Sequence, residues 1–179
     1  MVHTTTCPVL LVPPPPAERA VFSWRRVVCP VDFSPASVRA LACAVALAED
    51  GAPVTVLHVV ELPADDDGEA QHVSAYRRSR LEQARTALER MLQSEGRGRP
   101  LDEQLRAGKP SLELLRAALE MQADLLVLGA QGRGAGDAAA FGPTAQHIVR
   151  NTVCPVLTVP AVEAAAAPAP SGVSLPRPR

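Results

Sequence analysis

Short apolar runs alternate along this chain with longer stretches in which apolar residues recur at helical spacing. A short run rich in Val, Leu and Ile is typical of a strand buried on both faces, whereas a period of three to four residues indicates an amphipathic helix. The pattern predicts strands over residues 26–31, 54–60, 101–106, 124–128 and 153–159. It predicts helices over residues 36–50, 69–94, 111–121 and 143–151.

The regular alternation of strands and helices predicts an α/β fold, with an open parallel sheet, right-handed crossovers and helices on both faces. Ser34 and Pro35 are a typical helix start, with Ser as the N-cap and Pro at the first helical position, and Gly51 is expected to end that helix. Residues 101–106 alternate apolar and polar side chains, as an edge strand does.

Length and composition fit one domain with tails. The chain has 179 residues, a usual length for one domain, and 47% are hydrophobic, which argues against overall disorder. Aromatic residues make up only 3%, so the core is expected to consist of Val, Leu, Ile and Ala.

Charge and hydropathy exclude several partners. A net charge of −1 gives no field that would attract nucleic acid or anionic lipid, and no apolar stretch is long enough to span a membrane. The N-terminus lacks a basic region and a cleavage site, so it does not read as a signal peptide, and a cytoplasmic protein is expected. The cysteines form no CxxC pair and the histidines show no ligand spacing, so no metal site is predicted.

Two features follow strands that should be neighbours. Asp32 comes after the first strand, and a glycine-rich loop, residues 129–142, comes after the fourth. In a sheet of order 3-2-1-4-5, both would face the crevice at which open sheets bind ligands. A glycine-rich loop that enters a helix offers backbone N–H groups and a positive dipole end to phosphate. The chain has neither a Walker motif nor a GxGxxG after the first strand, which disfavours P-loop and dinucleotide sites.

Several of these residues also have simpler interpretations. The glycines can serve plain turns, and Asp32 can be a carboxylate that favours the first turn of a helix. Arg133 lies within the loop, where it is either a phosphate ligand or a solvated side chain. His58 is interpreted as a packed core residue and His147 as a surface or interface residue.

The blocks VVCPVDFSPASVRAL, VTVLHVVEL, GKPSLELLRAALEMQADLLVLG and GAQGRGAGDAAAFG, the last running on to CPVLTVP, resemble the universal stress protein family. The family's glycine motif is Gly, two residues, Gly, nine residues, Gly and then Ser or Thr. Gly129, Gly132 and Gly142 match this spacing, and the resemblance covers about three quarters of the chain.

The resemblance implies a five-stranded parallel sheet of the adenine nucleotide α-hydrolase-like, Rossmann-like kind, and a homodimer formed through the last strand, Val153 to Val159. In one subset of the family it also implies ATP binding, with magnesium as an optional companion. Asp32 would then contact the adenosine end, and the three glycines would hold the phosphates.

The chain departs from the family motif at Pro143, where the motif has Ser or Thr. Proline has neither a hydroxyl nor a backbone N–H, so two phosphate contacts are lost together. One such hydrogen bond to a charged group is worth about 1.5–3 kcal/mol. Thr144 could supply the hydroxyl if the helix start shifts, and Pro143 also has a simple interpretation as a helix initiator.

The first residues of the chain are similar in sequence to the last predicted strand. Residues 4–13, TTTCPVLLVP, are identical to residues 151–160, NTVCPVLTVP, at seven of ten positions. We therefore expect residues 1–13 to be the final strand of a preceding domain, 14–24 a proline-rich linker, 25–160 the main domain and 161–179 a disordered tail. The segment Cys7 to Val12 either is a frayed remnant or pairs antiparallel with the last strand and modulates dimerisation.

Two functional hypotheses remain open from the sequence. The first is a non-enzymatic stress-response protein that binds an adenine nucleotide through Asp32, Gly129, Gly132, Arg133, Gly142 and Thr144. The second is a nucleotide-independent interaction module in which Pro143 has disabled phosphate binding. An adenylating enzyme would need an SGGxDS-like loop after the first strand, where this chain has VDFSPAS, and no catalytic residue is predicted.

Overall fold

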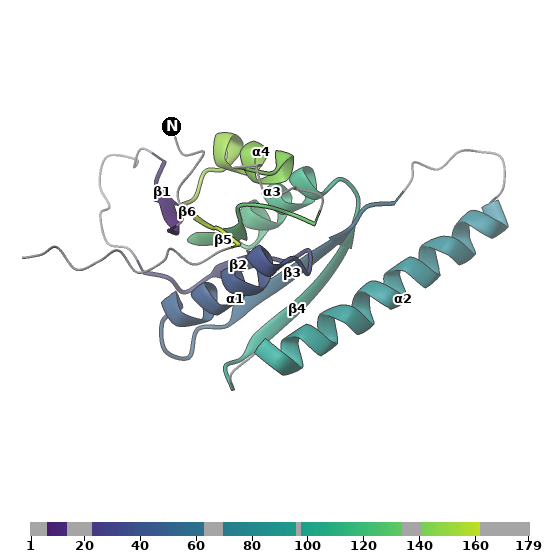
Figure 1. Cartoon of the computed structure of the whole chain (residues 1–179), viewed down its shortest axis with the longest axis horizontal. Coiled ribbons are helices and arrows are strands. Elements are labelled where there is room, and N and C mark those ends of the chain that lie inside the picture. Colours follow the sequence, from purple (N-terminus) through teal and green to yellow (C-terminus); the bar gives the residue numbers. More distant parts are fainter. Residues whose placement is uncertain (1–6, 14–22, 63–69, 96–97, 134–140, 162–179) are drawn as a thin grey trace, which may run out of the picture.

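The computed structural model describes residues 7–13, 23–62, 70–95, 98–133 and 141–161. The expected tail from 162 onward, and most of the predicted linker, lie outside the described residues. The elements, in chain order, are β1 (Val9–Leu11), β2 (Val27–Pro30), α1 (Pro35–Leu47), β3 (Val54–Val60), α2 (Ala70–Glu95), β4 (Leu101–Ala107), α3 (Pro110–Glu120), β5 (Leu125–Gly129), α4 (Pro143–Asn151) and β6 (Val156–Val159) (Figure 1).

The strands form one sheet in the order β1-β6-β5-β2-β3-β4. The strands from β6 to β4 are parallel to their neighbours, and their order is the predicted 3-2-1-4-5 when they are numbered along the chain. The predicted α/β class is therefore confirmed. The predicted count of five strands is corrected to six, because β1 joins the sheet antiparallel to β6.

Two helices cover each face of this sheet (Figure 1). Apolar residues of α1 and α2, among them Leu41 and Leu88, pack with Val27 and Val56 in one core cluster. Residues of α3 and α4 pack with the opposite faces of the same strands in a second cluster, which contains Ile148. None of the described helices is long and apolar enough to cross a membrane.

The first helix starts as the sequence predicts and ends earlier. Ser34 is the N-cap of α1, and its side-chain oxygen accepts a hydrogen bond from the backbone N–H of Ser37 over 3.2 Å. The helix ends at Leu47 rather than at residue 50, because the backbone N–H of Glu49 donates to the carbonyl of Trp24 over 3.0 Å instead of continuing the helical pattern.

The last strand is shorter than predicted. It begins at Val156 instead of Val153, whose side chain is 77% exposed. Pro155 precedes the strand and has no N–H to donate to a neighbouring strand.

The N-terminal strand β1 lies along the outer edge of β6. Its register pairs Val9 with Thr158, Leu10 with Leu157 and Leu11 with Val156. The Thr158 hydroxyl also donates to the Val9 carbonyl over 3.3 Å. Of the two alternatives that the sequence left open for this segment, the structure shows the antiparallel pairing, over the three residues of β1.

Candidate functional site

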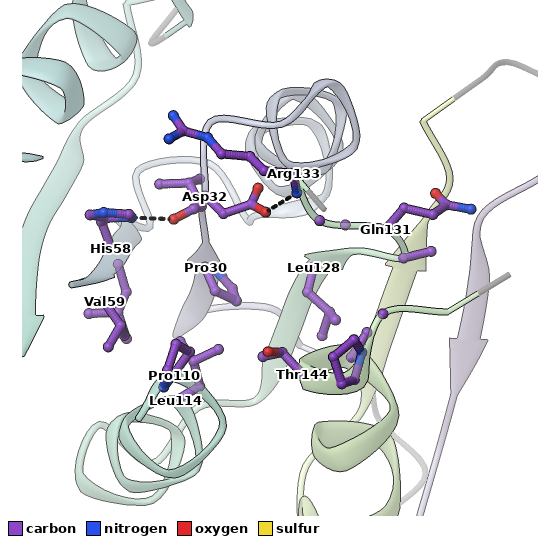
Figure 2. A pocket seen from close by; sticks show the side chains of 18 of the residues that line it. Pro30, Asp32, His58, Val59, Pro110, Leu114, Leu128, Gln131, Arg133 and Thr144 are labelled. Atoms are coloured by element: carbon purple, nitrogen blue, oxygen red, sulfur yellow. Dashed lines mark hydrogen bonds between the residues drawn. The ribbon is translucent and has the colours of Figure 1, made fainter. Parts of the chain in front are cut away.

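A cavity of about 580 Å³ opens at the carboxyl ends of β2 and β5, beside the starts of α3 and α4. Figure 2 shows its walls, which come from the loops after these strands and from the starts of α3 and α4. The side chains of Pro110 and Leu114 of α3 face Thr144 of α4 across it (Figure 2).

All the residues that the sequence singles out for a ligand line this one cavity. They are Asp32, Gly129, Gly132, Arg133, Gly142 and Thr144, and Pro143 joins them. Sequence positions about a hundred residues apart therefore meet at one place, as the predicted strand order requires. Residues 134–140 of the loop lie outside the described residues.

The carboxylate of Asp32 ties the start of α1 to the glycine loop. Oδ1 accepts hydrogen bonds from the backbone N–H and the hydroxyl of Ser34, over 3.0 and 2.5 Å. Oδ2 accepts from the backbone N–H of Arg133 over 3.1 Å (Figure 2). Burial works to raise the pKa of Asp32, but the hydrogen bonds from Ser34, Ser37 and Arg133 outweigh it, and the net pKa is lowered. The side chain is therefore an anion at neutral pH.

Two loop positions have no room for a side chain. A Cβ on Gly132 would lie 2.9 Å from Oδ2 of Asp32. A Cβ on Gly129 would lie 2.9 Å from the backbone nitrogen of Ser37, at the point where β5 packs against α1. Gly142 is different, because the nearest atom to its Cβ would be the nitrogen of Gly132 at 3.6 Å. Gly129 is thus required by close approach to backbone, whereas a side chain at Gly132 would displace the Asp32 carboxylate.

Two side chains of the cavity wall, His58 and Arg133, contact the ring of Phe33, an arrangement that the sequence does not indicate. The ring of Phe33 lies 4.6 Å from the ring of His58, centroid to centroid and tilted by 48°. The guanidinium of Arg133 lies 5.0 Å from the centroid of the Phe33 ring. Phe33 has a backbone φ of 63°, a left-handed conformation that is uncommon outside glycine. The only sequence signal was the position of Phe33 directly after Asp32.

His58 is half-buried and lines the cavity, so its interpretation as a plain core residue is incomplete. Its Nδ1 lies 2.7 Å from the carbonyl oxygen of Val31, and a carbonyl only accepts, so Nδ1 holds the proton (Figure 2). Burial lowers the pKa of His58 and outweighs the hydrogen bond to Val31, which works in the opposite direction. The ring is therefore neutral at pH 7. His147 is exposed, as predicted.

The start of α4 faces the same cavity. Gly142 is its N-cap and makes no side-chain capping hydrogen bond, and Pro143 occupies the first helical position. The N–H groups of the following residues, Thr144 and Ala145, therefore get no cap from the preceding side chain. The dipole of the helix adds positive potential at this point. Among the described residues, no cluster of three or more His, Cys, Asp or Glu side chains is placed to hold a metal ion.

Comparisons with known proteins agree with this architecture. A model of the universal stress protein family matches residues 23–160. A universal stress protein of Thermus aquaticus is 34% identical over 137 residues, which cover 76% of this chain and 98% of that protein.

Solved structures show the same fold. UspA of Lactobacillus plantarum superposes with a TM-score of 0.68 at 25% identity, over 76% of this chain and 98% of its own. A universal stress protein crystallised in complex with cAMP superposes with a TM-score of 0.50 at 23% identity, over 78% of this chain and 98% of its own. The chain belongs to the universal stress protein family.

Proposed function

We propose that the cavity binds an adenine nucleotide, and that the protein acts in stress response through this binding rather than through catalysis. The observation that supports the proposal is the meeting of Asp32, the glycine loop and the start of α4 around one cavity of about 580 Å³. A cavity of this size suits a small organic ligand. The structure of a family member with cAMP makes an adenine nucleotide the first candidate.

The phosphate group would lie against the glycine loop and the first turn of α4. Backbone N–H groups there, together with the Thr144 hydroxyl, are suitable donors to phosphate oxygens. Arg133 is the only basic residue within 129–145, a segment that also contains Asp137. Phosphate would therefore be held mainly by N–H dipoles, with Arg133 as the one cation.

The adenosine end would lie toward Asp32, as the family resemblance implies. Both oxygens of this carboxylate already accept hydrogen bonds from the protein, and each carboxylate oxygen can accept more than one. An N–H or O–H donor of the ligand can therefore be added without breaking the existing contacts. The ligand in this position would lie beside the neutral ring of His58.

A regulatory role fits the chemistry better than hydrolysis. His58 is a neutral imidazole whose pKa is lowered by burial, so its Nε2 is a weaker base than that of an ordinary histidine. Asp32 accepts hydrogen bonds at both of its oxygens and is a weak base because its pKa is lowered. ATP, with or without magnesium, would thus be bound as a signal.

Titration calorimetry of the purified chain with ATP, AMP, cAMP and GTP tests this proposal. We expect saturable binding of at least one adenine nucleotide, weaker binding of GTP and loss of binding in Asp32→Ala. Glu103→Ala is a suitable control, because Glu103 is an exposed residue of β4 that does not line the cavity. If none of the adenine nucleotides binds the natural chain, the proposal is wrong.

One observation supports the alternative of a nucleotide-independent interaction module. Pro143 stands at the first helical position of α4, where it offers neither hydroxyl nor N–H to a phosphate. A natural chain that binds no nucleotide, beside a Pro143→Ser variant that binds ATP, would identify this alternative.

A further inference from the structure

The strand β1 is a close copy of the strand that it covers. Residues 7–13 read CPVLLVP and residues 154–160 read CPVLTVP, so the two segments differ at one position. In this alignment Val9 corresponds to Val156, Leu10 to Leu157 and Leu11 to Thr158.

The pairing register of β1 on β6 is symmetric under this correspondence. Leu10 lies opposite Leu157, which is its own counterpart. Val9 lies opposite Thr158, the counterpart of Leu11, and Leu11 lies opposite Val156, the counterpart of Val9. Two identical β6 strands related by a twofold axis through Leu157 would pair in the same register.

The side-chain contact at this edge follows the same symmetry. The Thr158 hydroxyl donates to the carbonyl of Val9, the residue that corresponds to Val156. In a pair of β6 strands, this hydroxyl would face the carbonyl of Val156 of the second copy, and the contact would form twice. β1 forms it once, because Leu11 stands where the second copy has Thr158.

We propose that β1 takes the place of the β6 strand of a second copy of this chain, and that it closes the β6 edge within the same chain. The natural chain is then a monomer, and release of β1 opens an edge on which two copies pair antiparallel about Leu157. Unpaired edge strands readily pair with another strand, and a twofold pair of identical edges is a closed arrangement that stops at the dimer.

Sedimentation of the full chain and of Val9→Pro/Leu10→Pro tests the proposal. Consecutive N–H groups of a strand point alternately toward and away from a given neighbour, so one of the two prolines removes a donor that faces β6. Val12→Pro is the matched control, because Val12 is exposed and lies outside the β1 ladder. We expect 18.9 kDa for the natural chain and for Val12→Pro, and twice that mass for the double variant.

Disulfide cross-linking tests the register. In the double variant with Cys7→Ser, Leu157→Cys would lie opposite itself in the second copy, at a separation that a disulfide can bridge. Thr158→Cys is the register control, because it would lie opposite position 156. We expect covalent dimer on mild oxidation for Leu157→Cys and much less for Thr158→Cys.

Three results would overturn the proposal. The first is a natural chain that is already dimeric, and the second is a folded double variant that stays monomeric. The third is cross-linking that is equal at the two cysteine positions or absent from both, a readout that also distinguishes aggregation from the proposed pair. None of these results bears on nucleotide binding, because β1 does not line the cavity.

Discussion

The backbone N–H of Arg133 donates a hydrogen bond to Oδ2 of Asp32 over 3.1 Å, and so joins two loops that are 101 residues apart in the chain. Oδ1 of Asp32 accepts a hydrogen bond from Ser34, the N-cap residue of α1. Asp32 is therefore a structural anion as well as a candidate ligand contact. The sequence offered two interpretations of Asp32, a carboxylate at a helix start and a residue of the crevice. In the structure Asp32 is both.

Gly132→Ala should destabilise the protein and distort the loop. The new Cβ would lie 2.9 Å from Oδ2 of Asp32, and relief of this clash would stretch the hydrogen bond from Arg133. We expect a loss of about 1–3 kcal/mol in the free energy of unfolding, the usual cost of impairing a hydrogen bond to a charged group. Urea denaturation followed by circular dichroism measures it.

Gly142→Ala is the matched comparison for that experiment. Gly142 has a φ of −68°, which alanine adopts readily, and the nearest atom to its Cβ would be 3.6 Å away. We expect a change below about 1 kcal/mol. If both variants lose the same free energy of unfolding, the contact with Asp32 is not what makes the loop sensitive to a side chain at Gly132.

The stability that Asp32 contributes should depend on pH. Its folded pKa lies below the ordinary 3.8, so its contribution is present above that value and is lost as pH falls through the folded pKa. Asp32→Asn should therefore lose stability at pH 6 and approach the natural chain as pH falls below 3.8. Urea midpoints measured across this range check the prediction, and a difference that does not change with pH would contradict it.

Replacement of Pro143 should strengthen phosphate binding in two separable steps. Pro143→Ala restores a backbone N–H, and Pro143→Ser restores the N–H and a hydroxyl. We expect ATP to bind at least about tenfold more tightly to Pro143→Ala, since one charge-assisted hydrogen bond is worth about 1.5–3 kcal/mol, and more tightly still to Pro143→Ser. Calorimetric titration gives the three dissociation constants. Unchanged affinity in both variants would show that the phosphate does not lie at the start of α4.

His58 should titrate below the ordinary value of 6.5, because burial beside Phe33 and Val31 disfavours the imidazolium. The folded protein then binds fewer protons than the unfolded chain, so stability should decline as pH falls below about 6.5 toward the folded pKa. The ring proton resonances of His58, followed by NMR, give this pKa. A value at or above 6.5 would contradict the burial that places His58 in the cavity wall.

The elements and the residues at the strand ends could be predicted because their signals are local. Ser34 and Pro35 mark a helix start, and apolar runs mark buried strands, so Asp32 and Gly129 could be placed at strand ends. That they meet depends on the strand order of the sheet, which the structure shows. The end of α1 could not be predicted, because it depends on a hydrogen bond between Glu49 and Trp24, which are distant in sequence.

The contacts in and beside the cavity wall could not be predicted from the sequence pattern either. Phe33, His58 and Arg133 come from different segments and meet only in the folded chain. Leu114 is an apolar helix residue like others of α3, and only the packing of that helix on the sheet places it in the cavity. The similarity of residues 4–13 to the last strand indicated β1. The symmetric register in which β1 pairs with β6 could be seen only in the folded chain.

The most direct test of the central claim is an amide chemical-shift titration of the ¹⁵N-labelled chain with AMP, cAMP and ATP. If an adenine nucleotide occupies the cavity, the amides of Gly132, Arg133 and Thr144 should shift together and saturate, while that of Glu103 on the far edge of the sheet stays in place. The claim is contradicted if these three amides do not move at saturating nucleotide, or if the shifts concentrate away from the cavity.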